Sequence, residues 1–240
     1  VLADVDGDGD LDLLVNGIAA GTRLFLNDGK GHWSEVKDSG LSPTASGTSL
    51  ALADIDGDGD LDLYCAHYLD MLYLADPTTQ LTMGRQDGRP VVAKVNGQPA
   101  TLPRWNDRFE VLPNGEVREL GEADGLYRNN GRGRFTPIHL TPGTFSDEDG
   151  KPIPPDRALG LGAMFRDING DGAPDLYVAN DSGAPDRFWI NIGEGRFRAI
   201  DRFALRNGSH SSMGIDFADV DRDGYDDLLV LDMLARDHAK

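Results

Sequence analysis

Asp54-Ile-Asp-Gly-Asp-Gly-Asp-Leu-Asp62 is a nine-residue acidic loop, and its pattern occurs four times in this chain of 240 residues. Hard cations such as Ca²⁺ bind about six to eight oxygen ligands, and closely spaced carboxylates on a tight turn supply them. Without a cation, carboxylates that converge on one point repel one another and their pKa values rise. The repeat therefore predicts up to four Ca²⁺ sites. In chain order the copies, here named loops 1 to 4, are Asp4-Val-Asp-Gly-Asp-Gly-Asp-Leu-Asp12, the quoted loop, Asp167-Ile-Asn-Gly-Asp-Gly-Ala-Pro-Asp175 and Asp219-Val-Asp-Arg-Asp-Gly-Tyr-Asp-Asp227.

The differences between the copies indicate which positions bind the metal. Positions 1, 3, 5 and 9 are Asp in every copy except at Asn169, which still offers a carbonyl oxygen. Position 7 varies freely, as expected if only its backbone carbonyl binds, and position 6 is always Gly, which suits a positive φ. Loop 3 should bind most weakly, because Asn169 removes one negative charge. The predicted ligands are Asp4, Asp6, Asp8, Asp10 and Asp12; Asp54, Asp56, Asp58, Asp60 and Asp62; Asp167, Asn169, Asp171, Ala173 and Asp175; and Asp219, Asp221, Asp223, Tyr225 and Asp227.

An EF-hand is the obvious alternative, because its calcium loop is also rich in Asp. That loop needs a bidentate Glu at position 12 and a helix on each side. Position 12 is Val15, Cys65, Val178 or Val230, and none of these side chains binds calcium. The segments that follow the loops are short and apolar, which is typical of β-strands. Apolar residues at positions 2 and 10 should anchor each loop to a core on both sides.

The spacing of the loops predicts an all-β fold, a β-propeller built from four-stranded blades. The loops begin 50, 113 and 52 residues apart. A second signature, a hairpin turn of the form Asn-x-Gly-x-Gly, follows loops 1, 2 and 3 at Asn27, Asn129 and Asn191. Four strands that recur every fifty residues or so are typical of a propeller blade. We expect one arc over residues 1–240, with blades at 1–42, 45–140 and 157–206 and a partial blade at 207–240.

The long interval after loop 2 comes from an insert between the second and third strands of that blade, over residues 67–123. Its charges nearly balance, whereas the whole chain has a formal net charge of −18. Residues 109–117 look like a hairpin with an Asn-Gly turn, so the insert should be a small β-structured excursion. The candidates for ligand binding in the insert are Arg104, Trp105 and Arg108. For Trp105, the favoured interpretation is that its side chain fills the insert's own small core.

Composition limits the function. The chain has 41 acidic residues against 23 Lys plus Arg, which disfavours nucleic-acid binding. One Cys excludes an intramolecular disulfide, and no apolar run is long enough to span a bilayer. Val1 falls within a predicted strand and Lys240 follows half a blade, so we expect a fragment whose propeller is completed by other segments of the protein. The lack of a signal peptide in such a fragment says nothing about targeting.

These loops and turns resemble those of the FG-GAP/VCBS repeat group, whose propellers are similar to the head of integrin α subunits. Ser212-Met-Gly-Ile-Asp-Phe-Ala-Asp-Val-Asp221 and Leu126-Tyr-Arg-Asn-Asn-Gly131 carry a narrower resemblance to the cartilage acidic protein family and its bacterial relatives. The resemblance implies a secreted, cell-surface or periplasmic protein.

Two classes of function remain open. The first is a non-enzymatic recognition or adhesion module, in which mainly structural Ca²⁺ supports loops and an insert that present a surface to a protein or glycan. The second is an enzyme, a polysaccharide lyase, with His67, Tyr68 and Arg104 as candidate residues. We expect the insert, which the other blades lack, to carry the specificity.

Overall fold

The computed structural model describes residues 1–70, 72–181, 184–201, 204–205, 208–209 and 211–233. Within these residues the chain forms β-strands and turns and no α-helix, so the all-β class is confirmed. No helix in this part of the chain has the length and apolarity that a membrane crossing requires.

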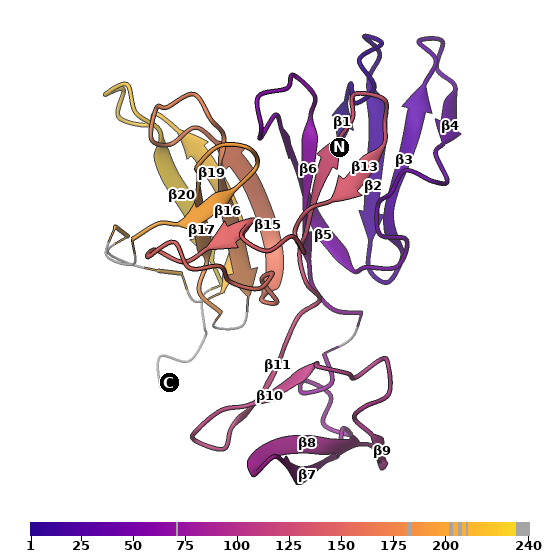
Figure 1. The fold of residues 1–240 in the computed structure, drawn as a ribbon, viewed down its shortest axis with the longest axis vertical. Helices are drawn as coiled ribbons and strands as arrows, with labels where there is room; N and C mark the ends of the chain where they lie inside the picture. The colour runs from indigo at the N-terminus through magenta and orange to yellow at the C-terminus, as the bar shows by residue number, and fades with distance from the viewer. Residues whose placement is uncertain (71, 182–183, 202–203, 206–207, 210, 234–240) are drawn as a thin grey trace.

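Three antiparallel four-stranded arrays and one two-stranded sheet follow one another along the chain (Figure 1). Each contains an acidic loop between its first two strands. Blade 1 contains β1 (Leu2–Ala3), β2 (Asp12–Gly17), β3 (Gly21–Asn27) and β4 (Trp33–Glu35). Blade 2 contains β5 (Gly47–Ala53), β6 (Asp62–His67), β12 (Gly125–Asn129) and β13 (Phe135–Pro137). Blade 3 contains β15 (Leu159–Arg166), β16 (Asp175–Asp181), β17 (Arg187–Asn191) and β18 (Phe197–Ala199), and blade 4 contains β19 (Ser212–Ala218) and β20 (Asp227–Asp232).

The blades stand side by side, and the apolar core lies between their faces. Strand β5 of blade 2 lies against β2 of blade 1 and β15 of blade 3, and β15 lies against β19 of blade 4. Thr48 Oγ1 donates to the carbonyl of Gly160 at 2.7 Å, and the amide of Ala163 donates to Ser49 Oγ at 3.1 Å. The largest core cluster joins blades 2 and 3 and includes Ile55, Leu126, Leu176, Trp189 and Phe197. This face-to-face packing is the arrangement of neighbouring propeller blades.

The apolar anchor at loop position 2 depends on this packing. Val5 and Ile55 are each 2% exposed, as expected. Val220 of loop 4 is 74% exposed, because no described blade packs against that face, so the anchor at position 2 stays a prediction for this loop.

The connection between blades 2 and 3 adds a strand that the sequence did not predict. Strand β14 (Phe145–Ser146) pairs in parallel with β18, so the sheet of blade 3 has five strands. Phe145 packs against Trp189 and Phe197 at ring-centroid distances of 5.0 and 5.7 Å. Burial of these aromatic rings holds the Pro-rich connection on the outer edge of the blade.

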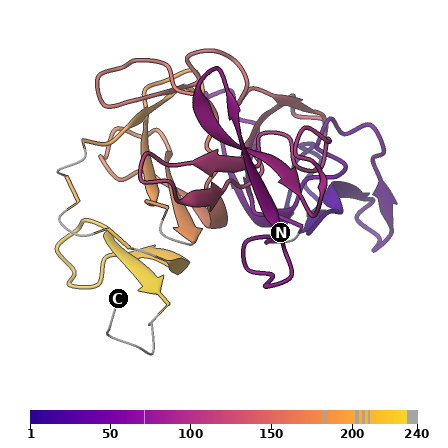
Figure 2. The same ribbon diagram turned by 90° about the horizontal axis from the view of Figure 1, so that it is seen from below.

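The insert projects from the end of the blades opposite to the acidic loops (Figure 1). Viewed from that end, it lies in front of the middle of the arc (Figure 2). The predicted hairpin is confirmed, because β10 pairs with β11 across the Asn114-Gly115 turn. The strands of the insert are β7 (Leu81–Gln86), β8 (Arg89–Val95), β9 (Gln98–Pro99), β10 (Phe109–Val111) and β11 (Val117–Glu119).

Candidate metal centres

Each acidic loop closes on the carboxylate at position 1. In loop 1, Asp4 Oδ1 accepts the amide of Gly7 at 2.8 Å, and Asp4 Oδ2 accepts the amide of Gly9 at 3.0 Å. Loops 2 and 3 repeat both contacts. The glycine at position 6 has φ between 89° and 93° in all four loops, so the predicted positive φ is confirmed. A side chain there would be strained, which explains why glycine recurs.

This closure brings acidic side chains together. In loop 1, oxygens of Asp4, Asp6 and Asp8 lie within 4.8 Å of one another. The equivalent residues of loop 2, Asp54, Asp56 and Asp58, converge in the same way, and in loop 4 Asp219, Asp221 and Asp227 do so. In loop 3, the amide of Asn169 donates to Asp171 Oδ2 at 2.9 Å. Three oxygens from separate carboxylates supply part of the all-oxygen donor set that Ca²⁺ prefers.

Loop 1 also contains an oxygen that lacks a donor. Asp6 Oδ1 is inaccessible to solvent and accepts no hydrogen bond of normal geometry from the described residues. Burial, followed by the nearby charges of Asp12 and Asp8, raises the pKa of Asp6. A buried acceptor without a donor is costly, and a cation would satisfy it. The residues of loop 1 therefore fit a bound cation.

The Asp at position 9 has a role that the sequence did not reveal. Asp12, Asp62 and Asp175 are at most 1% exposed and lie beneath their loops. In Asp62, Oδ2 accepts the amide of Ile55 at position 2, and Oδ1 accepts the amide of Asn129 in the hairpin turn. Asp12 and Asp175 make the same two contacts. Burial, the main cause, raises the pKa of Asp62 to about 6. Position 9 thus joins the acidic loop to the turn signature, and each oxygen keeps a lone pair for a metal.

The turn Asn extends this connection to the neighbouring blade. Asn129 Nδ2 donates to the carbonyl of Leu61 in its own loop at 3.1 Å and to the carbonyl of Val5 in loop 1 at 2.8 Å. Asn191 Nδ2 donates in the same way to Pro174 and to Ile55 of loop 2. Both sequence signatures therefore belong to one hydrogen-bonded unit that spans two blades.

In loops 1 and 2, the side chain at position 7 lies next to the hairpin turn of the same blade. A Cβ atom on Gly29 would lie 2.4 Å from a carboxylate oxygen of Asp10, and one on Gly131 would lie 2.5 Å from those of Asp60. Both glycines have φ of 67°, and this positive φ is the reason that glycine is favoured at these turn positions. In loop 4, Tyr225 is 75% exposed. Metal binding through the carbonyl of position 7 stays a prediction.

The ligand-binding candidates of the insert have mainly structural surroundings. Trp105 is 3% exposed in a core with Val92 and Val95, which is the interpretation that the sequence favoured. Arg108 is buried and pairs with Glu119 at 2.7 Å and with Asp70 at 3.0 Å. The prediction of a ligand surface is thus corrected for these two side chains, because burial removes them from contact with a ligand. Arg104 is exposed and stacks on the Trp105 ring.

The lyase candidates at the start of the insert are also held by internal contacts. His67 is 3% exposed, and its Nδ1 lies 2.6 Å from the carbonyl of Ala123. Tyr68 donates its hydroxyl to Asp181 at 2.8 Å.

A cleft of about 860 Å³ lies between the insert, the Pro-rich connection and blade 3. Its wall is largely apolar, and the polar groups in it include Asp156, whose carboxylate pairs with Arg187 at 2.6 Å. No sequence pattern predicts this cleft, because its walls come from segments far apart in the chain. Representative lining residues are Leu74, Leu120, Pro154, Arg157, Leu159 and Trp189.

Comparison with known proteins supplies the family. A family model described as an FG-GAP-like repeat matches residues 4–65 and 167–230, more than half of the chain, and these ranges contain all four acidic loops. No match was found among curated proteins.

Two solved structures show weaker likeness. One is an Agrocybe aegerita lectin, described as recognising non-reducing terminal N-acetylglucosamine. It is 18% identical with a TM-score of 0.24, and the match covers 82% of the present chain and 50% of the lectin chain. A Photorhabdus luminescens Tc holotoxin pore structure is 20% identical with a TM-score of 0.25, covering 96% of this chain and 11% of that chain. The chain therefore spans half or less of either protein, and likeness at this level decides neither its fold nor its ligand.

Proposed function

The chain belongs to the FG-GAP-like repeat family, and from that premise we propose that it is a calcium-stabilised recognition module of the β-propeller type, acting outside the cell or in the periplasm. The observation that supports calcium most directly is the convergence of the carboxylates at positions 1, 3 and 5 in loops 1 and 2, together with the donorless Asp6 Oδ1. The residues that would hold each ion are the side chains of positions 1, 3, 5 and 9 and the carbonyl of position 7. A bound Ca²⁺ supplies positive charge that offsets the repulsion among these carboxylates.

The calcium proposal is tested by titrating the full chain with Ca²⁺ in a calorimeter after chelator treatment. We expect binding at up to four sites, with weaker binding of Mg²⁺, which demands stricter octahedral geometry. The variant Asp54→Ala should lose one site, because Asp54 closes loop 2 through Gly57 and Gly59. If no heat is released at millimolar Ca²⁺, the proposal fails.

Recognition is assigned to the end of the blades opposite to the acidic loops. The cleft between the insert and blade 3 supports this, because it combines a volume in the range of ligand pockets with a mainly apolar wall. We propose that a protein or glycan ligand contacts this cleft and that the insert gives it specificity.

The experiment compares Leu74→Asp, which places a charge in the cleft, with Leu140→Asp, which changes a residue that is 68% exposed and is not part of the cleft wall. Both variants and a chain in which residues 70–122 are replaced by a short Gly-Ser bridge are applied with calcium to arrays of glycans and extracellular-matrix proteins. A ligand of the unaltered chain should be retained by Leu140→Asp and lost by the other two. Equal binding by Leu74→Asp would place recognition elsewhere.

We propose a non-enzymatic role. The contacts of His67 support it, since its side chain is 3% exposed and its Nδ1 lies against the carbonyl of Ala123. The hydroxyl of the half-buried Tyr68 is engaged by Asp181. A lyase would release unsaturated products that absorb ultraviolet light, so a rise in absorbance with acidic polysaccharides would contradict this role.

A further inference from the structure

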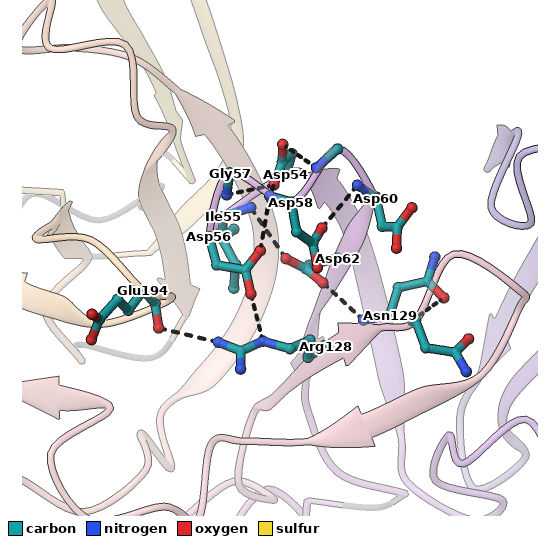
Figure 3. A network of polar contacts seen from close by, with 12 residues as sticks. Asp54, Ile55, Asp56, Gly57, Asp58, Asp60, Asp62, Arg128, Asn129 and Glu194 are labelled. Atoms are coloured by element: carbon teal, nitrogen blue, oxygen red, sulfur yellow. Dashed lines mark hydrogen bonds and ion pairs between the residues drawn. The ribbon is translucent and has the colours of Figure 1, made fainter.

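Arg128 gives loop 2 a feature that loops 1 and 3 do not have. It immediately precedes the turn Asn of blade 2, where blade 1 has Leu26 and blade 3 has Ile190. Its Nε lies 2.7 Å from Asp56 Oδ2 at position 3 of loop 2, and one of its terminal nitrogens donates to the carbonyl of Glu194 in blade 3 at 3.1 Å (Figure 3). A protein cation therefore contacts one of the three carboxylates that converge in this loop.

Loop 1 provides a natural comparison, because its nine residues differ from those of loop 2 only at position 2, Val5 against Ile55. In loop 1, Asp6 Oδ1 is buried and has no hydrogen-bond donor among the described residues. The equivalent Asp56 of loop 2 forms an ion pair with Arg128, although the Nε–H is not aligned for a hydrogen bond of normal geometry. Two loops with the same acidic residues thus differ in whether a positively charged side chain contacts position 3. The difference comes from Arg128 in strand β12, outside the loop.

The position of Arg128 is also a contact between blades. A Cβ atom on Gly195 in the turn of blade 3 would lie 3.2 Å from the guanidinium of Arg128. At the equivalent contact between blades 1 and 2, a Cβ atom on Gly133 in the turn of blade 2 would lie 3.3 Å from Leu26 of blade 1. Leu26 and Arg128 therefore occupy equivalent places against the next blade, and a leucine fits where Arg128 stands.

We propose that Arg128 sets the calcium affinity of loop 2, by pairing with Asp56 in competition with the metal, and that loop 2 consequently binds Ca²⁺ more weakly than loop 1. This inference rests on the proposed calcium function. A guanidinium close to position 3 opposes a divalent cation through charge repulsion and occupies one of its ligands. Because the same guanidinium holds the carbonyl of Glu194, calcium binding at loop 2 is coupled to the contact between blades 2 and 3.

The test exchanges the two residues. In the full chain, Arg128→Leu should raise the Ca²⁺ affinity of loop 2 by about tenfold. The reciprocal Leu26→Arg should lower the affinity of loop 1, and Arg128→Lys, which keeps the charge, should change the affinity of loop 2 less than Arg128→Leu does. Affinities are measured by calorimetry, and the step that belongs to loop 2 is identified by its loss in Asp58→Ala.

The outcomes separate the two proposals. If the unaltered chain binds no Ca²⁺, the proposed function fails. If it binds Ca²⁺ but Arg128→Leu leaves the loop 2 step unchanged, or alters all steps alike, the role of Arg128 is refuted. Melting curves recorded in chelator verify that each variant is folded, and Leu26→Arg supplies an independent test should Arg128→Leu be unstable.

Discussion

Asn129→Ala is the sharpest test of the connection between blades. In the folded chain, Asn129 is 3% exposed, and its Nδ2 donates to Leu61 within the blade and to Val5 in blade 1. Its Oδ1 accepts the amide of Asn130. The equivalent Asn27 of blade 1 donates to Leu11 and accepts the amide of Gly29, and among the described residues its Nδ2 has no partner in another blade. Asn27→Ala is therefore a matched control that removes the local contacts alone.

The expected loss follows from the contacts. A typical hydrogen bond contributes about 0.5–1.5 kcal/mol, and a buried polar group left without a partner costs about 1–3 kcal/mol. In Asn129→Ala the carbonyl of Leu61 loses its side-chain donor, while that of Val5 keeps the amide of Gly133 at 3.3 Å. We expect a loss of about 2–4 kcal/mol, against about 1 kcal/mol for the half-buried Asn27.

The assay is thermal and urea unfolding, followed by circular dichroism in calcium and in chelator. For a chain of this size, about 1 kcal/mol lowers the Tm by roughly 2–4 °C. Asn129→Ala should therefore lower the Tm by about 5–15 °C, and Asn27→Ala by less than about 5 °C. Equal losses in the two variants would show that the contact with Val5 adds nothing, and the connection between blades through the turn Asn would be refuted.

Two further predictions concern calcium and pH. Chelation should lower the Tm by tens of degrees, because a site with Ca²⁺ at a hundredfold above its Kd adds about 2.7 kcal/mol of stability and four such sites add roughly 11 kcal/mol. Asp58→Ala should reproduce part of this loss, and Asp60→Ala much less. Equal melting curves with and without chelator would contradict the prediction. Burial lowers the pKa of His67, so its neutral form belongs to the folded state and stability should fall as pH drops below the ordinary value of about 6.5. Urea midpoints between pH 7 and pH 5 should fall less in His67→Gln than in the exposed control His32→Gln, and identical slopes would remove His67 as a cause.

Much of the fold is visible in the sequence because a blade is a local unit. The acidic loop, the strand after it and the Asn-x-Gly-x-Gly turn recur with regular spacing, and each reflects short-range requirements such as the positive φ of Gly59. These patterns predict the strands of blades 1 to 3 and the hairpin of the insert, which the structure contains. They also predict the converging carboxylates at positions 1, 3 and 5 of loops 1 and 2.

The tertiary structure decided which neighbour each of these groups meets. The same Asn forms a local contact at Asn27 and a contact between blades at Asn129, and the same Asp is donorless at Asp6 and paired with Arg128 at Asp56. Strand β14, the cleft and the burial of Trp105 likewise depend on segments that meet only after folding. A repeat with a fixed period reports the conformation of one blade, because hydrogen bonds and steric limits within a blade act over a few residues. It does not report the partners across a blade interface, because those partners lie far apart in the sequence, 66 residues for Arg128 and Glu194 and 124 for Asn129 and Val5, and are chosen by packing.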